Sequence, residues 1–137
     1  MTVLKQYNTG TGTWETIVSG SQGAQGTPGT LFNYTINPQT TTTYTFVGTD
    51  ASALVTLSNT SSITVTVPTN ASVGLPVGTQ LNIIQINTGQ VTVVGASGVT
   101  VASSAATSNS PKLRGQYSAA SLIKADTNTW YVVGDIA

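Results

Sequence analysis

The sequence contains no cysteine and no histidine. Without these residue types there is no disulfide framework, no zinc site of the usual kinds, and no Cys-His or Ser-His-Asp arrangement for nucleophilic catalysis. Charge is also scarce: 6% of the 137 residues are charged, against about a quarter in an ordinary soluble domain. Four acidic residues balance four basic ones. A neutral surface attracts neither nucleic acid nor an anionic membrane, so we expect neither as a partner.

Long apolar runs are absent as well. No stretch approaches the length of a transmembrane helix. Residues 1–5 lack the positively charged opening and the long apolar run of a signal peptide. We therefore expect synthesis in the cytoplasm of the host, without export by the general route.

The acidic residues are few and scattered along the chain: Glu15, Asp50, Asp126 and Asp135. A glycosidase needs two carboxylates on opposite sides of a bond, and calcium needs six or more oxygens, several of them from neighbouring carboxylates. No Gly-x-x-x-x-Gly-Lys phosphate loop occurs either. We therefore expect no enzymatic activity, no catalytic residue, no bound metal and no cofactor.

Glycine, by contrast, recurs at every third position of a short run, at Gly20, Gly23, Gly26 and Gly29. Strict Gly-X-Y spacing lets three polyproline II chains wind together, because only glycine fits at the crowded axis. The run therefore predicts a collagen-like stalk in a homotrimer, formed by residues 20–30. The alternative is a flexible Gly/Ser/Gln linker, which needs no periodicity.

The segment before this run, residues 1–19, has the pattern of a β-hairpin. A run of turn formers at residues 8–12 separates two short β-like stretches. Tyr7 and Trp14 are placed to meet across the strands, where aromatic pairs stabilise a sheet. Because two strands alone are marginal in water, the hairpin needs a partner surface.

Residues 31–137 have an all-β pattern, with β-branched residues throughout and turn signals between short strands. We predict one antiparallel, jelly-roll-like β-sandwich. An Asn37-Pro38 turn separates the first two strands, and a hairpin around residues 126–128 closes the fold. The predicted strands are residues 31–36, 41–47, 53–57, 62–67, 80–86, 91–94, 99–101, 116–124 and 129–133.

Two of these strands differ in pattern. Residues 62–67 alternate cleanly between apolar and threonine positions. Residues 80–86 do not, because Leu81, Ile83, Ile84 and Ile86 break the alternation. We expect that strand to be bulged or buried on both faces.

Three further features are candidates for binding. Lys112 and Arg114 form a basic pair that suits an acidic partner or an anionic sugar, or alternatively a polar strand edge. Thr-x-Thr patterns are typical of ice-binding surfaces, but without a fixed repeat we interpret them as solvent-facing strand positions. The aromatic residues form either a sugar-stacking platform or part of a core or interface; they are Trp14, Tyr34, Tyr44, Tyr117, Trp130 and Tyr131.

Several motifs of the chain, and the order in which they follow one another, resemble tailed-bacteriophage fibre and virion surface proteins. The opening from Tyr7 to Glu15, followed by Gly-x-Gln-Gly triplets, is similar to the start of many such proteins. A module common in the same proteins is similar to residues 62–137. Its motifs are Ile-Thr-Val-Thr-Val-Pro (63–68), Leu-Pro-Val-Gly-Thr-Gln (75–80), Gly-Gln-Val-Thr-Val (89–93), Lys-Leu-Arg-Gly-Gln-Tyr-Ser-Ala-Ala (112–120) and Trp-Tyr-Val-Val-Gly-Asp (130–135).

The resemblance implies a non-enzymatic, trimeric protein on the outer surface of a phage particle. It has an attachment end, a short stalk and a β-sandwich knob. At about 3.1 Å per residue the stalk is only about 28 Å long, which suits a capsid decoration (cement) protein or short head fibre. Its partner is then the major capsid protein or another virion protein. The candidate contact residues are Val3, Leu4, Tyr7, Trp14, Ile17 and Val18.

Two alternatives remain open. One is the receptor-binding knob of a short tail fibre, which recognises a cell-surface glycan through exposed aromatic residues and polar loops. The other is a baseplate or neck component, which shares the same sequence features.

Overall fold

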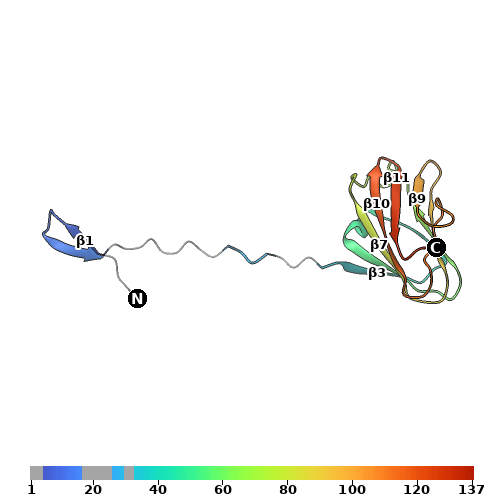
Figure 1. The fold of residues 1–137 in the computed structure, drawn as a ribbon, viewed down its shortest axis with the longest axis horizontal. Helices are drawn as coiled ribbons and strands as arrows, with labels where there is room; N and C mark the ends of the chain where they lie inside the picture. Colours follow the sequence, from blue (N-terminus) through green and yellow to red (C-terminus); the bar gives the residue numbers. More distant parts are fainter. Residues whose placement is uncertain (1–4, 17–25, 30–32) are drawn as a thin grey trace. The chain divides into compact units, whose positions relative to one another are not determined.

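The computed structural model describes residues 5–16, 26–29 and 33–137 (Figure 1). Its contacts divide the chain into two units, residues 1–32 and residues 33–137, and each is considered by itself. Six of the candidate residues lie outside the described parts: Val3, Leu4, Ile17, Val18, Gly20 and Gly23. Their roles stay predictions.

The described part of the first unit contains the predicted hairpin. Strands β1 (Lys5–Asn8) and β2 (Thr13–Thr16) pair antiparallel, with Tyr7 opposite Trp14. Asn8 closes the turn, since its Oδ1 accepts a hydrogen bond from the backbone nitrogen of Gly10 at 2.9 Å. Gly12 takes a φ of 67°, a left-handed conformation that favours glycine. The turn residues therefore have the conformations that their chemistry predicts.

The glycines of the Gly-X-Y run are described only in part. Gly26 and Gly29 lie in a segment without regular secondary structure, and neither meets an atom within 4 Å of an added Cβ. A triple helix needs three chains, so the stalk also stays a prediction.

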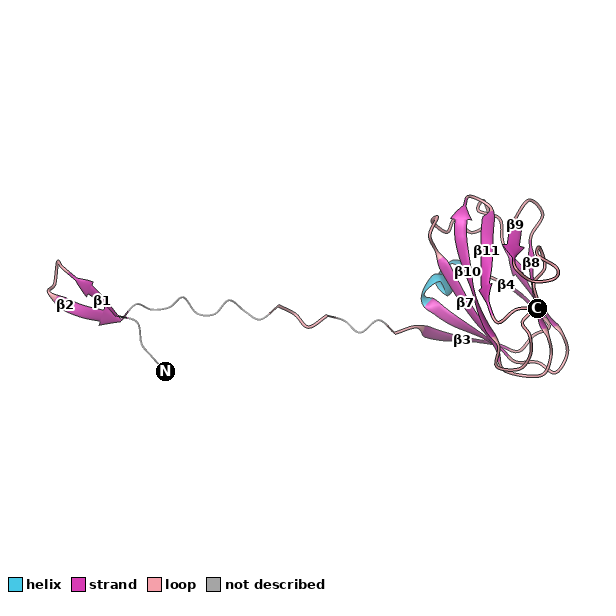
Figure 2. Ribbon diagram, viewed as in Figure 1, coloured by secondary structure: helices cyan, strands magenta, loops and turns pink. Residues whose placement is uncertain are grey.

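The second unit is built from two β-sheets, so the all-β prediction is confirmed (Figure 2). A 3₁₀-helix, η1 (Gly48–Ser52), lies between the strands Thr43–Thr45 and Ala53–Leu57. The six-stranded sheet has the order β3 (Thr35–Gln39), β5 (Ala53–Leu57), β7 (Gln80–Gln85), β10 (Ala119–Asp126), β11 (Thr129–Gly134), β9 (Thr100–Ser103). The three-stranded sheet has the order β4 (Thr43–Thr45), β6 (Ile63–Val67), β8 (Val91–Gly95).

Alternate residues of both sheets point into one hydrophobic core. Val55 and Leu81 come from the six-stranded sheet, and Val65 and Val93 come from the three-stranded sheet. The period-two alternation of residues 62–67 matches the buried positions of β6. The largest buried side chain is Trp130 of β11, which is 2% exposed.

The prediction of antiparallel pairing is wrong for most of this domain. Within residues 33–137, five of the seven strand pairings are parallel. From β3 to β8 the chain alternates between the two sheets, so each return to a sheet brings the next strand in the same direction. A jelly roll consists of antiparallel Greek keys, so these pairings do not support that part of the prediction.

Two local predictions also need correction. Asn37-Pro38 is not a turn but lies within β3, where Pro38 pairs with Thr56 of β5. Proline is tolerated there because β3 is an edge strand, which leaves one side of its backbone unpaired. β7 is regular rather than bulged: Leu81, Ile83 and Gln85 are buried, and Ile84 is half-buried on the opposite face. The predicted closing hairpin, β10–β11, is confirmed.

Candidate functional site

The surface of the six-stranded sheet that points away from the core, here called the outer face, is unusually apolar. Its outward positions include large exposed residues such as Ile36, which is 55% exposed, and Val133, which is 50% exposed. A sheet with one solvated face normally carries polar residues at these positions. The exposed large residues of the outer face are Tyr34, Ile36, Ile123, Tyr131 and Val133.

Strand register divides these residues into two apolar strips. The β3 strip consists of Tyr34, Ile36 and Leu54, and the β11 strip consists of Ile123, Tyr131 and Val133. One row of paired residues runs across the sheet from the first strip to the second: Ile36, Leu54, Asn82, Ser121 and Val133. The strips therefore lie on opposite sides of a polar centre.

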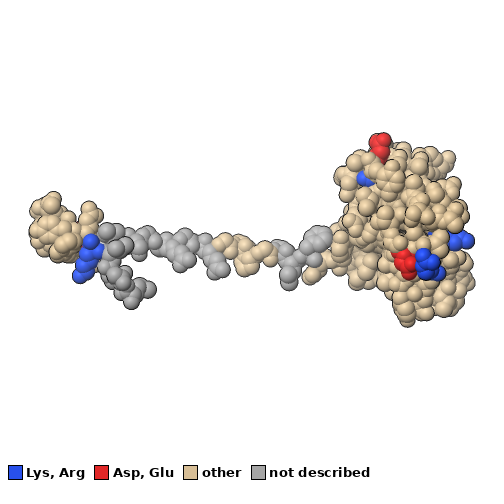
Figure 3. All heavy atoms as spheres, in the orientation of Figure 1, with Lys and Arg blue, Asp and Glu red and all other residues tan. Residues whose placement is uncertain are grey.

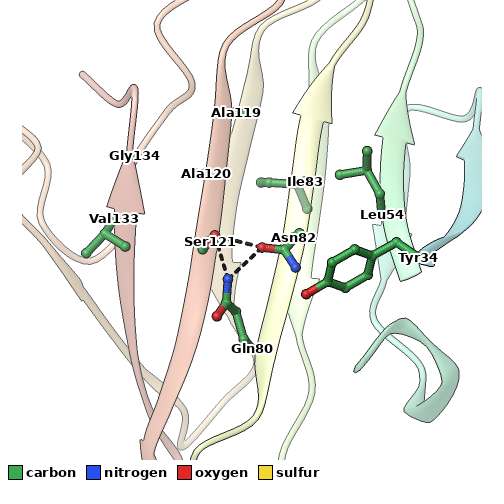
Figure 4. Close-up of a pocket in the computed structure, with 10 residues that line it drawn as sticks. All are labelled: Tyr34, Leu54, Gln80, Asn82, Ile83, Ala119, Ala120, Ser121, Val133 and Gly134. Carbon is green, nitrogen blue, oxygen red and sulfur yellow. Dashed lines mark hydrogen bonds between the residues drawn. The ribbon is translucent and has the colours of Figure 1, made fainter. Parts of the chain in front are cut away.

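The polar centre is formed by Gln80, Asn82 and Ser121, here called the amide row (Figure 4). Gln80 Nε2 donates to Asn82 Oδ1 at 2.9 Å and to Ser121 Oγ at 3.2 Å. Ser121 Oγ donates to Asn82 Oδ1 at 2.7 Å. These three bonds do not use Gln80 Oε1 or Asn82 Nδ2.

A hollow of about 410 Å³ lies over the amide row. Small residues at one side make room for it: Ala119, Ala120 and Gly134. Gly134 has a φ of 143°, and a Cβ there would lie 2.5 Å from the carbonyl oxygen of Ala119. None of the ten lining residues is Asp, Glu, Lys or Arg. The hollow therefore suits a neutral partner.

The three-stranded sheet presents the opposite chemistry. Thr43, Thr64 and Thr92 lie in register on its solvent side, next to Thr45 and Thr66. The residues on β4 are exposed, and those on β6 and β8 are exposed or half-buried. The interpretation of the Thr-x-Thr positions as solvent-facing is confirmed for these strands, and the apolar surface belongs to the six-stranded sheet.

The hairpin carries a second exposed aromatic surface. The rings of Tyr7 and Trp14 meet edge to face with centroids 5.3 Å apart, so their predicted contact is confirmed. Trp14 remains 66% exposed despite this contact. A two-stranded unit with such a side chain in water has apolar surface to bury on a partner.

One member of the basic pair, Arg114, has partners within the chain. Arg114 Nε contacts Asp135 Oδ1 at 2.7 Å, and Arg114 Nη2 donates to the carbonyl of Ile136. The hydrogen bond from Ser118 and then the one from Arg114 lower the pKa of Asp135. The backbone of Lys112 forms an antiparallel β-bridge with Thr92 at the edge of β8, and the Lys112 side chain is exposed. Both residues therefore help to attach the C-terminal segment and the β8 edge, and their binding role stays a prediction.

The structure does not bring the aromatic residues of the second unit together as a sugar platform. Trp130 is in the core, and Tyr44 is half-buried in a polar cluster. Tyr34 and Tyr131 share the outer face but lie in opposite strips. Tyr117 is exposed outside the strands.

Sequence reasoning missed a buried carboxylate, Asp50 of η1. Its oxygens accept hydrogen bonds from Asn37 Nδ2 at 2.8 Å, from the Tyr44 hydroxyl at 2.7 Å and from the backbone nitrogen of Val47 at 2.9 Å. The cluster borders a hollow of about 670 Å³. A single carboxylate with these donors satisfied supplies neither a second acid for hydrolysis nor a metal site, and it fixes η1 against β3 and β4.

The same cluster predicts an alkaline transition. Burial, and then the hydrogen bond to Asp50, raise the pKa of Tyr44 to about 12. Since the folded state favours the neutral phenol, the stabilisation is fully present below about pH 10 and is lost as the pH rises through 12. We expect ultraviolet titration to show one late tyrosinate step that Tyr44→Phe removes and Tyr131→Phe retains. A late step that survives in Tyr44→Phe contradicts this assignment.

Within residues 5–16, 26–29 and 33–137, the structure contains no helix long and apolar enough to cross a membrane. The same described residues contain no group of three or more His, Cys, Asp or Glu side chains suited to a metal ion. No protein-family model matches the chain, and a search of curated proteins finds no match. The fold and its surfaces thus define the class only as an all-β protein with two exposed apolar surfaces.

Proposed function

We propose that this chain is a non-enzymatic structural protein of a bacteriophage particle. It acts as a trimeric capsid decoration (cement) protein or short head fibre that binds and stabilises the particle. The observation that carries the proposal is the hairpin, a separate two-stranded unit with Tyr7 and Trp14 exposed to solvent. Two strands of this size bury too little surface to be stable alone, which favours a docking role.

Three further features support the proposal. The near absence of charge favours contacts between copies of the chain and with other neutral surfaces. In Figure 3, charged side chains are few on the visible surface of the described residues. The Gly-X-Y run and the order of the motifs add the expectation of a trimer, in which residues 33–137 form the β-sandwich knob. Three linked copies gain avidity for a threefold site that one copy lacks.

Deletion of residues 1–19 tests the attachment role. We expect the truncated protein to lose binding to phage particles prepared without this protein, while the far-ultraviolet circular dichroism of the knob is retained. The double variant Tyr7→Ala/Trp14→Ala is expected to weaken binding at least tenfold. The matched control Thr43→Ala/Thr64→Ala alters two exposed residues of the knob and is expected to bind normally. Unchanged binding by the truncated protein contradicts the proposal.

A second candidate function is recognition of a cell-surface glycan, with the chain as a receptor-binding knob. The observation that favours it is the neutral hollow, which is lined by Tyr34 and by the amide side chains of Gln80 and Asn82. A sugar ring stacks on tyrosine and exchanges hydrogen bonds with amides. A glycan array separates the two functions, because a decoration protein is expected to give no selective hit.

A further inference from the structure

We propose that the outer face of the six-stranded sheet is the contact between three copies of this chain, with the β3 strip of each copy packed on the β11 strip of the next. The inference rests on the trimer in the proposed function and assigns its contact surface. The glycan-binding function would use the same face, so the inference and that function exclude each other.

The first step is that a partner covers the outer face when the protein functions. Its largest exposed side chains are Ile, Val and Tyr, whereas five of the six outward positions of the three-stranded sheet carry Thr. Both sheets share one core, so this difference is not a general property of the chain. Contiguous apolar surface on a soluble protein marks an interaction site.

The second step is that the occupant is a further copy. Across β3, β5, β7, β10 and β11, no side chain of the two strips or the amide row is charged. Two copies therefore face one another without like-charge repulsion, and a charged partner gains no attraction. Because each amide side chain of the amide row carries both donors and an acceptor, the row is chemically suited to face an identical row.

The third step is that the number of copies is three. Two apolar strips flank the hollow over the amide row, so each face is built to meet two neighbours rather than one, and three is the smallest number of copies that closes such a ring. Around a threefold axis the strips pack pairwise, and the amide row lines the axis, where water accommodates its polar groups. Ile36 and Val133 belong to the same register row, so they lie at the same height along an axis parallel to the strands.

The size of the face explains why a tether matters. Six strands at about 4.8 Å spacing and about five residues of height give a projected area on the order of 400 Å². A stable complex buries about 800 Å² on each partner. The Gly-X-Y run offsets this small contact area, because linked chains meet at an effective concentration near the millimolar range for short linkers. Tyr34 follows Gly29 closely, so the β3 strip is the first part of the knob after the run.

Paired cysteines in the full-length chain test the inference, since the natural sequence has none. We choose Ile36→Cys/Val133→Cys and, as a second pair, Tyr34→Cys/Tyr131→Cys. In one copy β3 and β11 are four strand spacings apart, about 19 Å, and a disulfide tolerates no more than about 7 Å between Cα atoms. Any bridge is therefore between copies, and a closed ring gives a covalent trimer on a non-reducing denaturing gel.

The matched control places the same two cysteines on the threonine surface, as Thr43→Cys/Thr92→Cys, and is expected to stay monomeric on the gel. Covalent trimers from either strip pair support the inference. Covalent dimers alone, or an open ladder, overturn the threefold packing. No cross-link from either pair, with an uncross-linked mass of three chains, overturns the assignment of the face and leaves the trimer intact. A solution mass of one chain overturns the trimer itself. A glycan that binds the natural protein but not Val133→Glu assigns the face to sugar binding instead.

Discussion

Replacing Trp130 with alanine is expected to destabilise the knob by about 3–5 kcal/mol, because the change leaves a large cavity in the core. Trp130 is the largest buried side chain, and it packs in β11 between β10 and β9. The buried side chain of Lys124 also lies beside the Trp130 ring. That lysine is 2% exposed, its Nζ lies 5.8 Å from the centroid of the Trp130 ring, and it donates to Asn70 Oδ1 and the Leu75 carbonyl. The alanine variant thus removes the ring that covers one side of the buried Lys124 side chain.

Urea unfolding followed by circular dichroism measures this effect without using tryptophan as the reporter. The control is Val77→Ala, which also shortens an apolar side chain but at a position 61% exposed in a loop. We expect the control to change the free energy of unfolding by less than about 0.5 kcal/mol. A Trp130→Ala loss as small as that of the control contradicts the placement of this residue in the core.

Gly89→Ala is expected to be nearly as damaging, at about 3 kcal/mol or more, although it adds only one methyl group. A Cβ at Gly89 would lie 1.9 Å from the carbonyl oxygen of Ser61 and 2.5 Å from that of Asn59. Both contacts are with backbone, so no side-chain rotation relieves them. Gly89 also donates its backbone N–H to Asn59 at 2.9 Å, which holds the β7–β8 turn against the β5–β6 turn.

Gly115→Ala is the matched control, because an added Cβ there meets no atom within 4 Å. We expect this control to match the wild type in thermal unfolding or to be slightly more stable, since alanine restricts the unfolded chain. Equal melting temperatures for the two variants would show that the two turns are not in close contact.

Local sequence patterns predicted the strands well and their pairing poorly. Alternation within residues 62–67 and the turn formers at residues 8–12 act over a few residues, so β6 and the β1–β2 hairpin were readable. Parallel or antiparallel pairing depends on where the chain travels between strands, and the crossing from one sheet to the other has no local signal. The misassigned Asn37-Pro38 turn shows the same limit, because only the position of β3 at an edge makes proline acceptable.

The candidate surface left one trace in the sequence. Ile84 broke the alternation of its strand, which we attributed to a bulge or to burial on both faces. In the structure it is an outward residue of the outer face, half-buried between β5 and β10. The two strips and the amide row, in contrast, come from five strands whose order is non-consecutive, and no sequence window contains them. The Asp50 cluster was missed for the same reason, since Asn37, Tyr44 and Asp50 meet only through folding.

The central claim of this account is that the chain works as a threefold adhesion protein. The most direct test is the mass of the purified full-length protein, measured by light scattering coupled to size exclusion at micromolar concentration. The account predicts a mass of three chains, about 42 kDa from the 14.0 kDa of one chain. A mass of one chain at that concentration would contradict the claim, and the Gly-X-Y run would then be a linker.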